Sequence, residues 1–181
     1  RVLGICGSPR KDGNSEALLN HALNPFREQD WEVSLFLLSK NTITPCLGCD
    51  ECVTTRECTV HDDMQLLYTE YGRCDAIIIS TPVYYRNVTA QLKAVFDRTY
   101  AAEYDLLTGK VGGAIAVGRG TGGGQALTLA IIHNFFLSSG MICVPGEING
   151  VSAVAGDPGD ILEQPERLAQ AEILGKNVMA V

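Results

Sequence analysis

The sequence predicts an α/β fold in which a doubly wound, five-stranded parallel sheet carries helices on both faces. Short apolar runs rich in β-branched residues alternate with longer amphipathic stretches along the chain. The run AIII at residues 76–79 is apolar at every position, as expected of a strand buried on both faces. Five β-then-α units arise in this way, and such alternation implies a parallel sheet covered by helices.

The first half of the chain supplies three of the expected strands, at residues 2–6, 31–38 and 76–79. A helix should begin near Asn14 or Ser15, because either side chain is a favourable N-cap. Asp62 is placed to cap a further helix, since an acidic side chain is favoured at a helix N-terminus. The segment between the second strand and Asp62 is rich in cysteine.

The second half continues the alternation with a helix, a strand, a glycine-rich loop and a second helix. We expect these at residues 90–104, 111–117, 118–124 and 125–137. A last short strand at 141–144, a glycine-rich loop at 145–160 and a weaker helix at 161–178 follow. We expect the whole chain, 1–181, to be a single domain with a cysteine-rich loop at 45–60.

Charge and hydropathy narrow the class of protein. The net charge is −7, the isoelectric point is about 4.9, and no cluster of lysine or arginine occurs. We therefore expect no binding to nucleic acid or to an anionic membrane surface. No apolar run reaches the roughly 18 residues of a membrane span.

The cysteine count indicates a reducing compartment. Seven cysteines are an odd number, which fits a secreted disulfide framework poorly. The chain enters a strand at once and shows no signal-peptide layout. We expect a cytoplasmic protein. Cys6, Cys74 and Cys143 lie in or beside apolar strands and should be buried fillers.

The loop after the first strand, GSPRKDGNS at residues 7–15, has the character of a phosphate site. It leads into a helix N-terminus, where backbone N–H groups and the helix dipole favour an anion. Ser8, Asn14 and Ser15 add donors, and Arg10 or Lys11 offsets charge. Neither a P-loop nor a dinucleotide fingerprint follows this strand.

The loop after the third strand, STPVYYRNV at residues 80–88, places aromatic side chains at the carboxyl edge of the sheet. Ligands of parallel sheets bind at this edge, and aromatic surface suits a flat conjugated ring. A phosphate loop together with an aromatic loop suggests FMN, a mononucleotide. The glycine-rich loop at 118–124 would lie on the same edge. Packing of the tyrosines against a neighbouring helix or subunit is the alternative.

The cysteines at positions 46, 49, 52 and 58 follow the pattern C-x2-C-x2-C-x5-C. Consecutive C-x2-C steps resemble the ferredoxin run that binds a [4Fe–4S] cluster. Structural zinc usually takes paired C-x2-C knuckles that are farther apart. A cluster, a zinc ion, and free or transiently disulfide-bonded thiols remain as three interpretations.

The motifs GSPRKDGNS, PCLGCDECVTTREC…HDD and STPVYYRNVTAQLKAVFDR, in this order and with a glycine-rich loop after the fourth strand, resemble those of the iron-sulfur flavoproteins. That family belongs to the NAD(P)H-dependent FMN reductase group, whose fold is flavodoxin-like. The resemblance covers almost the whole chain. It implies a flavin-dependent oxidoreductase built as a homodimer or homotetramer, with flavin and cluster near the subunit interfaces.

The resemblance also implies roles for individual residues. The [4Fe–4S] ligands would be Cys46, Cys49, Cys52 and Cys58. The FMN phosphate would be held by Ser8, Arg10, Asn14 and Ser15. The two sides of the isoalloxazine would be lined by Pro82, Val83, Tyr84 and Tyr85, and by Arg119, Gly120, Thr121 and Gly122. No acid–base side chain is required, because the cofactors carry the chemistry.

We therefore expect an electron-transfer flavoprotein with ferredoxin as donor and a two-electron acceptor such as oxygen or peroxide. The alternative is an NAD(P)H-dependent FMN or quinone reductase whose cysteines are structural. A redox- or metal-sensing module that uses the four thiols is a third, non-enzymatic class.

Overall fold

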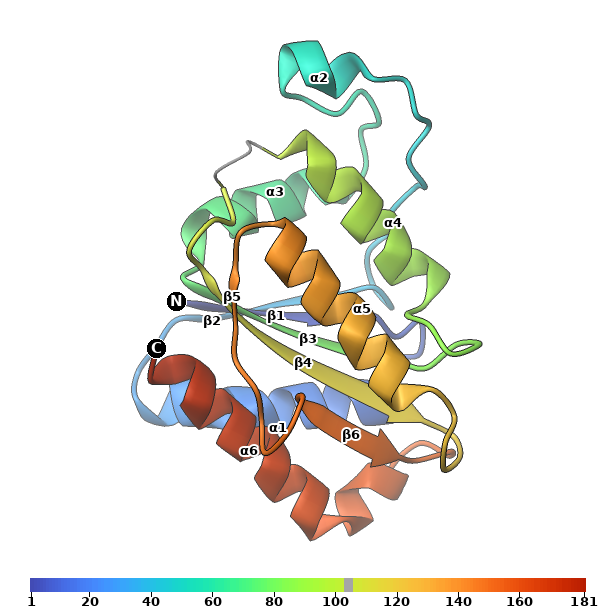
Figure 1. Cartoon of the computed structure of the whole chain (residues 1–181), viewed down its shortest axis with the longest axis vertical. Coiled ribbons are helices and arrows are strands. Elements are labelled where there is room, and N and C mark those ends of the chain that lie inside the picture. The colour runs from blue at the N-terminus through green and yellow to red at the C-terminus, as the bar shows by residue number, and fades with distance from the viewer. Residues whose placement is uncertain (103–105) are drawn as a thin grey trace.

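The computed structural model describes residues 1–102 and 106–181, and among them the sheet has six strands (Figure 1). The strands are β1 (Val2–Cys6), β2 (Val33–Leu37), β3 (Ala76–Pro82), β4 (Val111–Gly118), β5 (Ile142–Cys143) and β6 (Val151–Val154). The α-helices are α1 (Asn14–Glu28), α2 (Glu51–Thr55), α3 (Met64–Arg73), α4 (Ala90–Arg98), α5 (Gln125–Ser138) and α6 (Pro165–Met179). Two 3₁₀ helices are η1 (Thr99–Ala101) and η2 (Asp160–Glu163).

The sheet is parallel throughout, in the order β2-β1-β3-β4-β5, with β6 also paired to β4. The predicted doubly wound α/β fold is confirmed, but the expected five strands become six. The two last strands share one position, because β5 pairs with the start of β4 and β6 with its end. The sequence did not predict β6, because this strand is only four residues long and lies within the segment 145–160 that was expected to be a loop.

Each face of the sheet carries its own apolar layer (Figure 1). Helices α3, α4 and α5 cover one face, onto which Ile77 and Ile79 of β3 point. Helices α1 and α6 cover the other, which receives Ala76 and Ile78 of the same strand. All four side chains are buried, so β3 is enclosed on both faces as its uniformly apolar sequence indicated.

The helix expected at 90–104 is shorter than predicted. It ends as α4 at Arg98 and tightens into η1, and the rest of the predicted helix, at 103–104, lies outside the described residues. In the cysteine segment the structure adds α2, which projects beyond α4 at one end of the molecule (Figure 1). No described helix is both long enough and apolar enough to cross a bilayer.

The close contact of α1 with α6 gives a test of this packing. A Cβ atom at Gly175 would lie 2.0 Å from the backbone oxygen of Ala22, whereas at Gly72 of α3 the nearest atom would be 3.6 Å away. Gly175→Ala should lower the free energy of unfolding by about 1–3 kcal/mol through overpacking. Gly72→Ala should leave it unchanged or raise it by about 0.4–1 kcal/mol. Urea unfolding of both variants measures this difference, and equal stabilities would contradict the packing.

Candidate functional site

Hydrogen bonds join the loops that follow β1, β3 and β4 at the carboxyl edge of the sheet. The Gly7 N–H donates to the Ser80 carbonyl at 2.7 Å, and the Thr89 hydroxyl donates to the Gly7 carbonyl at 2.7 Å. The Val83 N–H donates to the Val117 carbonyl at 2.8 Å. The position of each loop is therefore set by the backbone of its neighbour.

These loops enclose a pocket of about 340 Å³. Eight of the twelve residues expected around FMN line it: Ser8, Arg10, Asn14, Ser15, Pro82, Val83, Tyr84 and Arg119. Gly13 of the loop at 7–15 also lines it, and the structure adds residues that the sequence did not single out: Val117, Ala155, Gly156 and Pro158. The last three follow β6, so they were missed together with that strand.

The other four expected residues do not line this pocket. Tyr85 is fully exposed at the tip of a tight turn in which Tyr84 and Asn87 exchange backbone hydrogen bonds of 2.9 and 3.1 Å. Tyr85 and Arg86 both have left-handed φ angles, of 49° and 65°, as such a turn requires. The tip of the loop after β4, residues 120–122, is also exposed and outside the lining.

The start of α1 provides the anion-binding features of the pocket. Within the described chain, its first turn receives no side-chain cap, so its N–H groups stay available at the Gly13–Ser15 wall. The Ser8 hydroxyl accepts the Arg10 N–H at 3.1 Å and fixes the loop that precedes the helix. Arg10 is exposed and brings a positive charge to the same wall.

Asn14 has a different contact from the one that its position in the motif indicated. Its amide donates to the Asp157 carbonyl at 2.8 Å and accepts the N–H groups of Gly159 and Ile161 at 3.1 and 3.3 Å. The side chain thus links the end of the loop that follows β1 to the segment that follows β6. Asn14 shapes the pocket wall, whereas Arg10 lines the pocket as an exposed, positively charged residue.

Arg10 and Asn14 should therefore differ in their effect on flavin binding. Arg10→Ala should weaken FMN about tenfold and riboflavin little, because a charge-assisted hydrogen bond to phosphate contributes about 1.5–3 kcal/mol. Asn14→Ala should weaken both flavins alike, because it loosens a wall. Flavin fluorescence titration measures the affinities, with Asn24→Ala, a partly buried position on the same helix that does not line the pocket, as control. A phosphate-selective loss in Asn14→Ala would contradict the assignment.

The four clustered cysteines line a second, smaller pocket of about 60 Å³. Cys46 and Cys49 are exposed, and Cys52 and Cys58 are partly buried. A contact of 3.5 Å with the Thr59 hydroxyl lowers the pKa of Cys49. Burial raises the pKa of Cys52, and the other three thiols add to that rise because they lie close by.

This pocket is not arranged for a single metal ion. In residues 1–102 and 106–181, no group of three or more His, Cys, Asp or Glu side chains converges as one ion requires. A zinc site would place every sulfur about 2.3 Å from a single point. A cubane cluster binds each thiolate at a different iron, so its four sulfurs stand farther apart around a central volume. The lining brings all four thiols to one cavity, and four thiolates are the donor set that a [4Fe–4S] cluster requires.

The other three cysteines line neither of these two pockets. Cys6 and Cys74 are buried, and burial raises their pKa values to about 12 and about 11. Both are therefore poor thiolates at neutral pH. Cys143 is partly buried and its pKa is also raised by burial.

A buried ion pair closes the base of the cysteine segment. Arg98 Nη1 lies 2.5 Å from Asp62 Oδ2, and the same carboxylate accepts the Thr44 N–H at 2.8 Å. Burial acts to raise the pKa of Asp62, but the hydrogen bonds from Arg98 and from the Thr44 and Met64 N–H groups outweigh it and lower the pKa. Asp62 was expected only as a helix cap, and it does accept the Met64 N–H at 3.0 Å.

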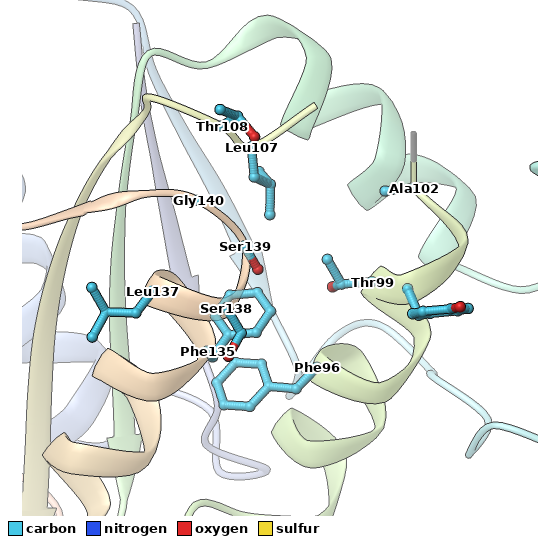
Figure 2. Close-up of a pocket in the computed structure, with 11 residues that line it drawn as sticks. Phe96, Thr99, Ala102, Leu107, Thr108, Phe135, Leu137, Ser138, Ser139 and Gly140 are labelled. Carbon is cyan, nitrogen blue, oxygen red and sulfur yellow. The ribbon is translucent and has the colours of Figure 1, made fainter. Parts of the chain in front are cut away.

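A third pocket, of about 400 Å³, lies between the ends of α4 and α5 (Figure 2). Phe96 and Phe135 stack within it at a centroid distance of 4.1 Å. It adjoins residues 107–108, just before β4 begins, and so lies away from the carboxyl edge where ligands of parallel sheets bind. Tyr100 lines both this pocket and the cysteine pocket, so η1 separates the two.

Comparison with known proteins agrees with this geometry. The family model described as NADPH-dependent FMN reductase matches residues 1–155. An iron-sulfur flavoprotein from Methanocaldococcus jannaschii is 39% identical over 186 aligned positions, which cover 100% of this chain and 96% of that protein. The structure is similar to an NAD(P)H:quinone oxidoreductase from Methanothermobacter marburgensis, with a TM-score of 0.72, 16% identity and 98% of each chain covered. An archaeal flavodoxin aligns with a TM-score of 0.61, 15% identity and 98% of each chain covered.

The fold and the site thus define a flavodoxin-like, flavin-dependent oxidoreductase with FMN as its flavin. Within that class, the chain belongs to the iron-sulfur flavoprotein family of the NADPH-dependent FMN reductase group.

Proposed function

We propose that the protein transfers electrons between a one-electron donor of the ferredoxin type and a two-electron acceptor, through a [4Fe–4S] cluster and FMN. The observation that carries this proposal is the presence of two pockets in one chain. One lies at the carboxyl edge of the sheet, and the other is lined by Cys46, Cys49, Cys52 and Cys58.

The 340 Å³ pocket would hold FMN. The uncapped start of α1 and the charge of Arg10 are suited to its phosphate. Pro82, Val83 and Tyr84 offer apolar and aromatic surface to the flat ring system. Arg119, whose guanidinium lies 3.8 Å from the Asp157 carboxylate, also lines the pocket.

The cysteine pocket would hold the cluster. When bound, FMN exchanges one or two electrons and a [4Fe–4S] cluster exchanges one, so together they link one-electron and two-electron partners. The chain contributes four thiolates and a wall formed by Asp97, Arg98 and Tyr100. The free state of the described cysteines agrees with a reducing compartment, and we propose a cytoplasmic location.

No described residue lines both the flavin pocket and the cysteine pocket. This separation supports a homodimer or homotetramer in which subunit contacts bring flavin and cluster together. Oxygen, peroxide or a quinone would be the acceptor. We also propose that the chain is a single domain, in which the loop at 45–60 binds the cluster.

A second function is direct hydride transfer from NAD(P)H to FMN, with reduction of free FMN or a quinone. The description of the family as NADPH-dependent and the fold shared with a quinone oxidoreductase favour it. In this reaction NAD(P)H loses two electrons as hydride and no cluster is needed.

Anaerobic mixing distinguishes the two functions. Reduced ferredoxin should bleach the flavin absorbance rapidly, while NADH and NADPH should reduce it at least about tenfold more slowly, because the proposed route enters at the cluster. Stopped-flow absorbance measures both rates. Rapid bleaching by NADPH, unaltered in a cluster-free variant, would establish the second function instead.

Substitution of a cluster ligand tests the assignment of the cysteines. Cys49→Ala should lose most of the bound iron and sulfide yet keep FMN, because the two pockets share no lining residue. Cys143→Ala, outside the segment, should keep both. Metal analysis after anaerobic purification provides the measurement, and equal iron in Cys49→Ala and the parent chain would remove Cys49 from the ligand set.

A further inference from the structure

Arg98 has an unusual place in the structure. Its guanidinium is fully buried, and it is the largest fully buried side chain among the described residues. Arginine is rarely buried without partners, because the charge is costly to remove from water. The residue lies at the C-terminus of α4, in the wall of the cysteine pocket.

The guanidinium joins the two stems of the cysteine segment. Nη1 donates to the Thr44 carbonyl at 3.2 Å, two residues before Cys46. Nη2 donates to the Val60 carbonyl at 2.7 Å, two residues after Cys58. The ion pair with Asp62 completes the set, so one planar group contacts the segment where it leaves the body of the protein and where it returns.

One donor of this group has no partner. Arg98 Nε is buried and makes no hydrogen bond within the described structure. A buried, unused N–H is rare in native proteins and costs about 1–3 kcal/mol. Cys58 lines the same pocket as Arg98 and is close enough to interact with the guanidinium.

We propose that Arg98 is a positioning residue for the cluster site, which holds both stems of the cysteine segment and keeps Cys58 at the pocket so that the four thiols surround one cavity before a cluster enters. The inference rests on the proposed cluster function and deepens it. The free Nε–H is available to a sulfur of Cys58 or of the cluster.

Lysine cannot replace arginine in this role. Arg98 has three partners: a backbone carbonyl on each stem and the Asp62 carboxylate. A planar guanidinium with donors in fixed directions can bind all three at once. A lysine ammonium retains the charge but concentrates its donors at one point. Charge alone therefore does not explain the residue.

The test compares Arg98→Lys with the parent chain and with Arg73→Lys, which makes the same change at an exposed arginine 3.9 Å from its nearest acid. The rate at which a chelator removes iron from anaerobically prepared holoprotein should rise at least about tenfold in Arg98→Lys, the range seen when outer-shell partners of metal ligands are lost. It should stay unchanged in Arg73→Lys. FMN affinity should be unchanged in both, because Arg98 does not line the flavin pocket.

Equal iron release from folded Arg98→Lys and the parent would overturn the inference. If Arg98→Lys does not fold, the double variant Arg98→Gln with Asp62→Asn removes both buried charges and takes its place in the same assay. If the parent chain takes up no iron, the proposed function fails. The role of Arg98 is then tested on the metal-free protein. Alkylation of Cys58, followed by peptide mass analysis, should then be at least about threefold faster in Arg98→Lys, and an equal rate would overturn it.

Discussion

The parallel pairing of β3 with β1 on one side and β4 on the other determines where the functional parts of this chain lie. Because residues 76–80 pair with both neighbours and residues 81–82 continue the pairing with β4, the loops after the three strands emerge at one edge. Hydrogen bonds from Gly7 to Ser80 and from Val83 to Val117 continue that register past the strand ends. The pocket is a consequence of the sheet, and the apolar sequence of β3, buried on both faces, makes the sheet possible.

The cysteine segment depends on a different interaction. It leaves the body of the protein after β2, and only α2 gives it regular structure, with left-handed residues at both ends of that short helix. Its stems are held by Arg98, the last residue of α4, and by Asp62, which precedes α3. A segment this exposed has little apolar surface to bury, so its order in this structure depends on the polar contacts at its base. The pocket suited to flavin is therefore formed by the sheet and its loops, whereas the four thiols lie on a separate, exposed segment.

The sequence predicted those features that rest on local pattern. Buried strands, the loop at 7–15 and the cysteine spacing each have a signal within a few residues, and the structure brings eight of the twelve expected flavin residues together. Features that depend on tertiary contacts were missed. The strand β6 is too short to show a periodicity and forms only because the end of β4 is free to pair. Asn14 contacts residues more than 140 positions away in the sequence. Arg98 is the last residue of an amphipathic helix, and nothing in the neighbouring sequence indicates its contacts with the cysteine segment.

The most direct test of the proposal that this chain carries both a flavin and a cluster is its cofactor content. Protein purified without oxygen should contain one FMN per chain together with iron and inorganic sulfide in a ratio of about 4:4, the composition of a [4Fe–4S] cluster. Zinc should be absent, because the proposal assigns the four thiolates to a [4Fe–4S] cluster. Flavin-loaded protein with no iron, and no capacity to incorporate it during anaerobic reconstitution, would contradict the account.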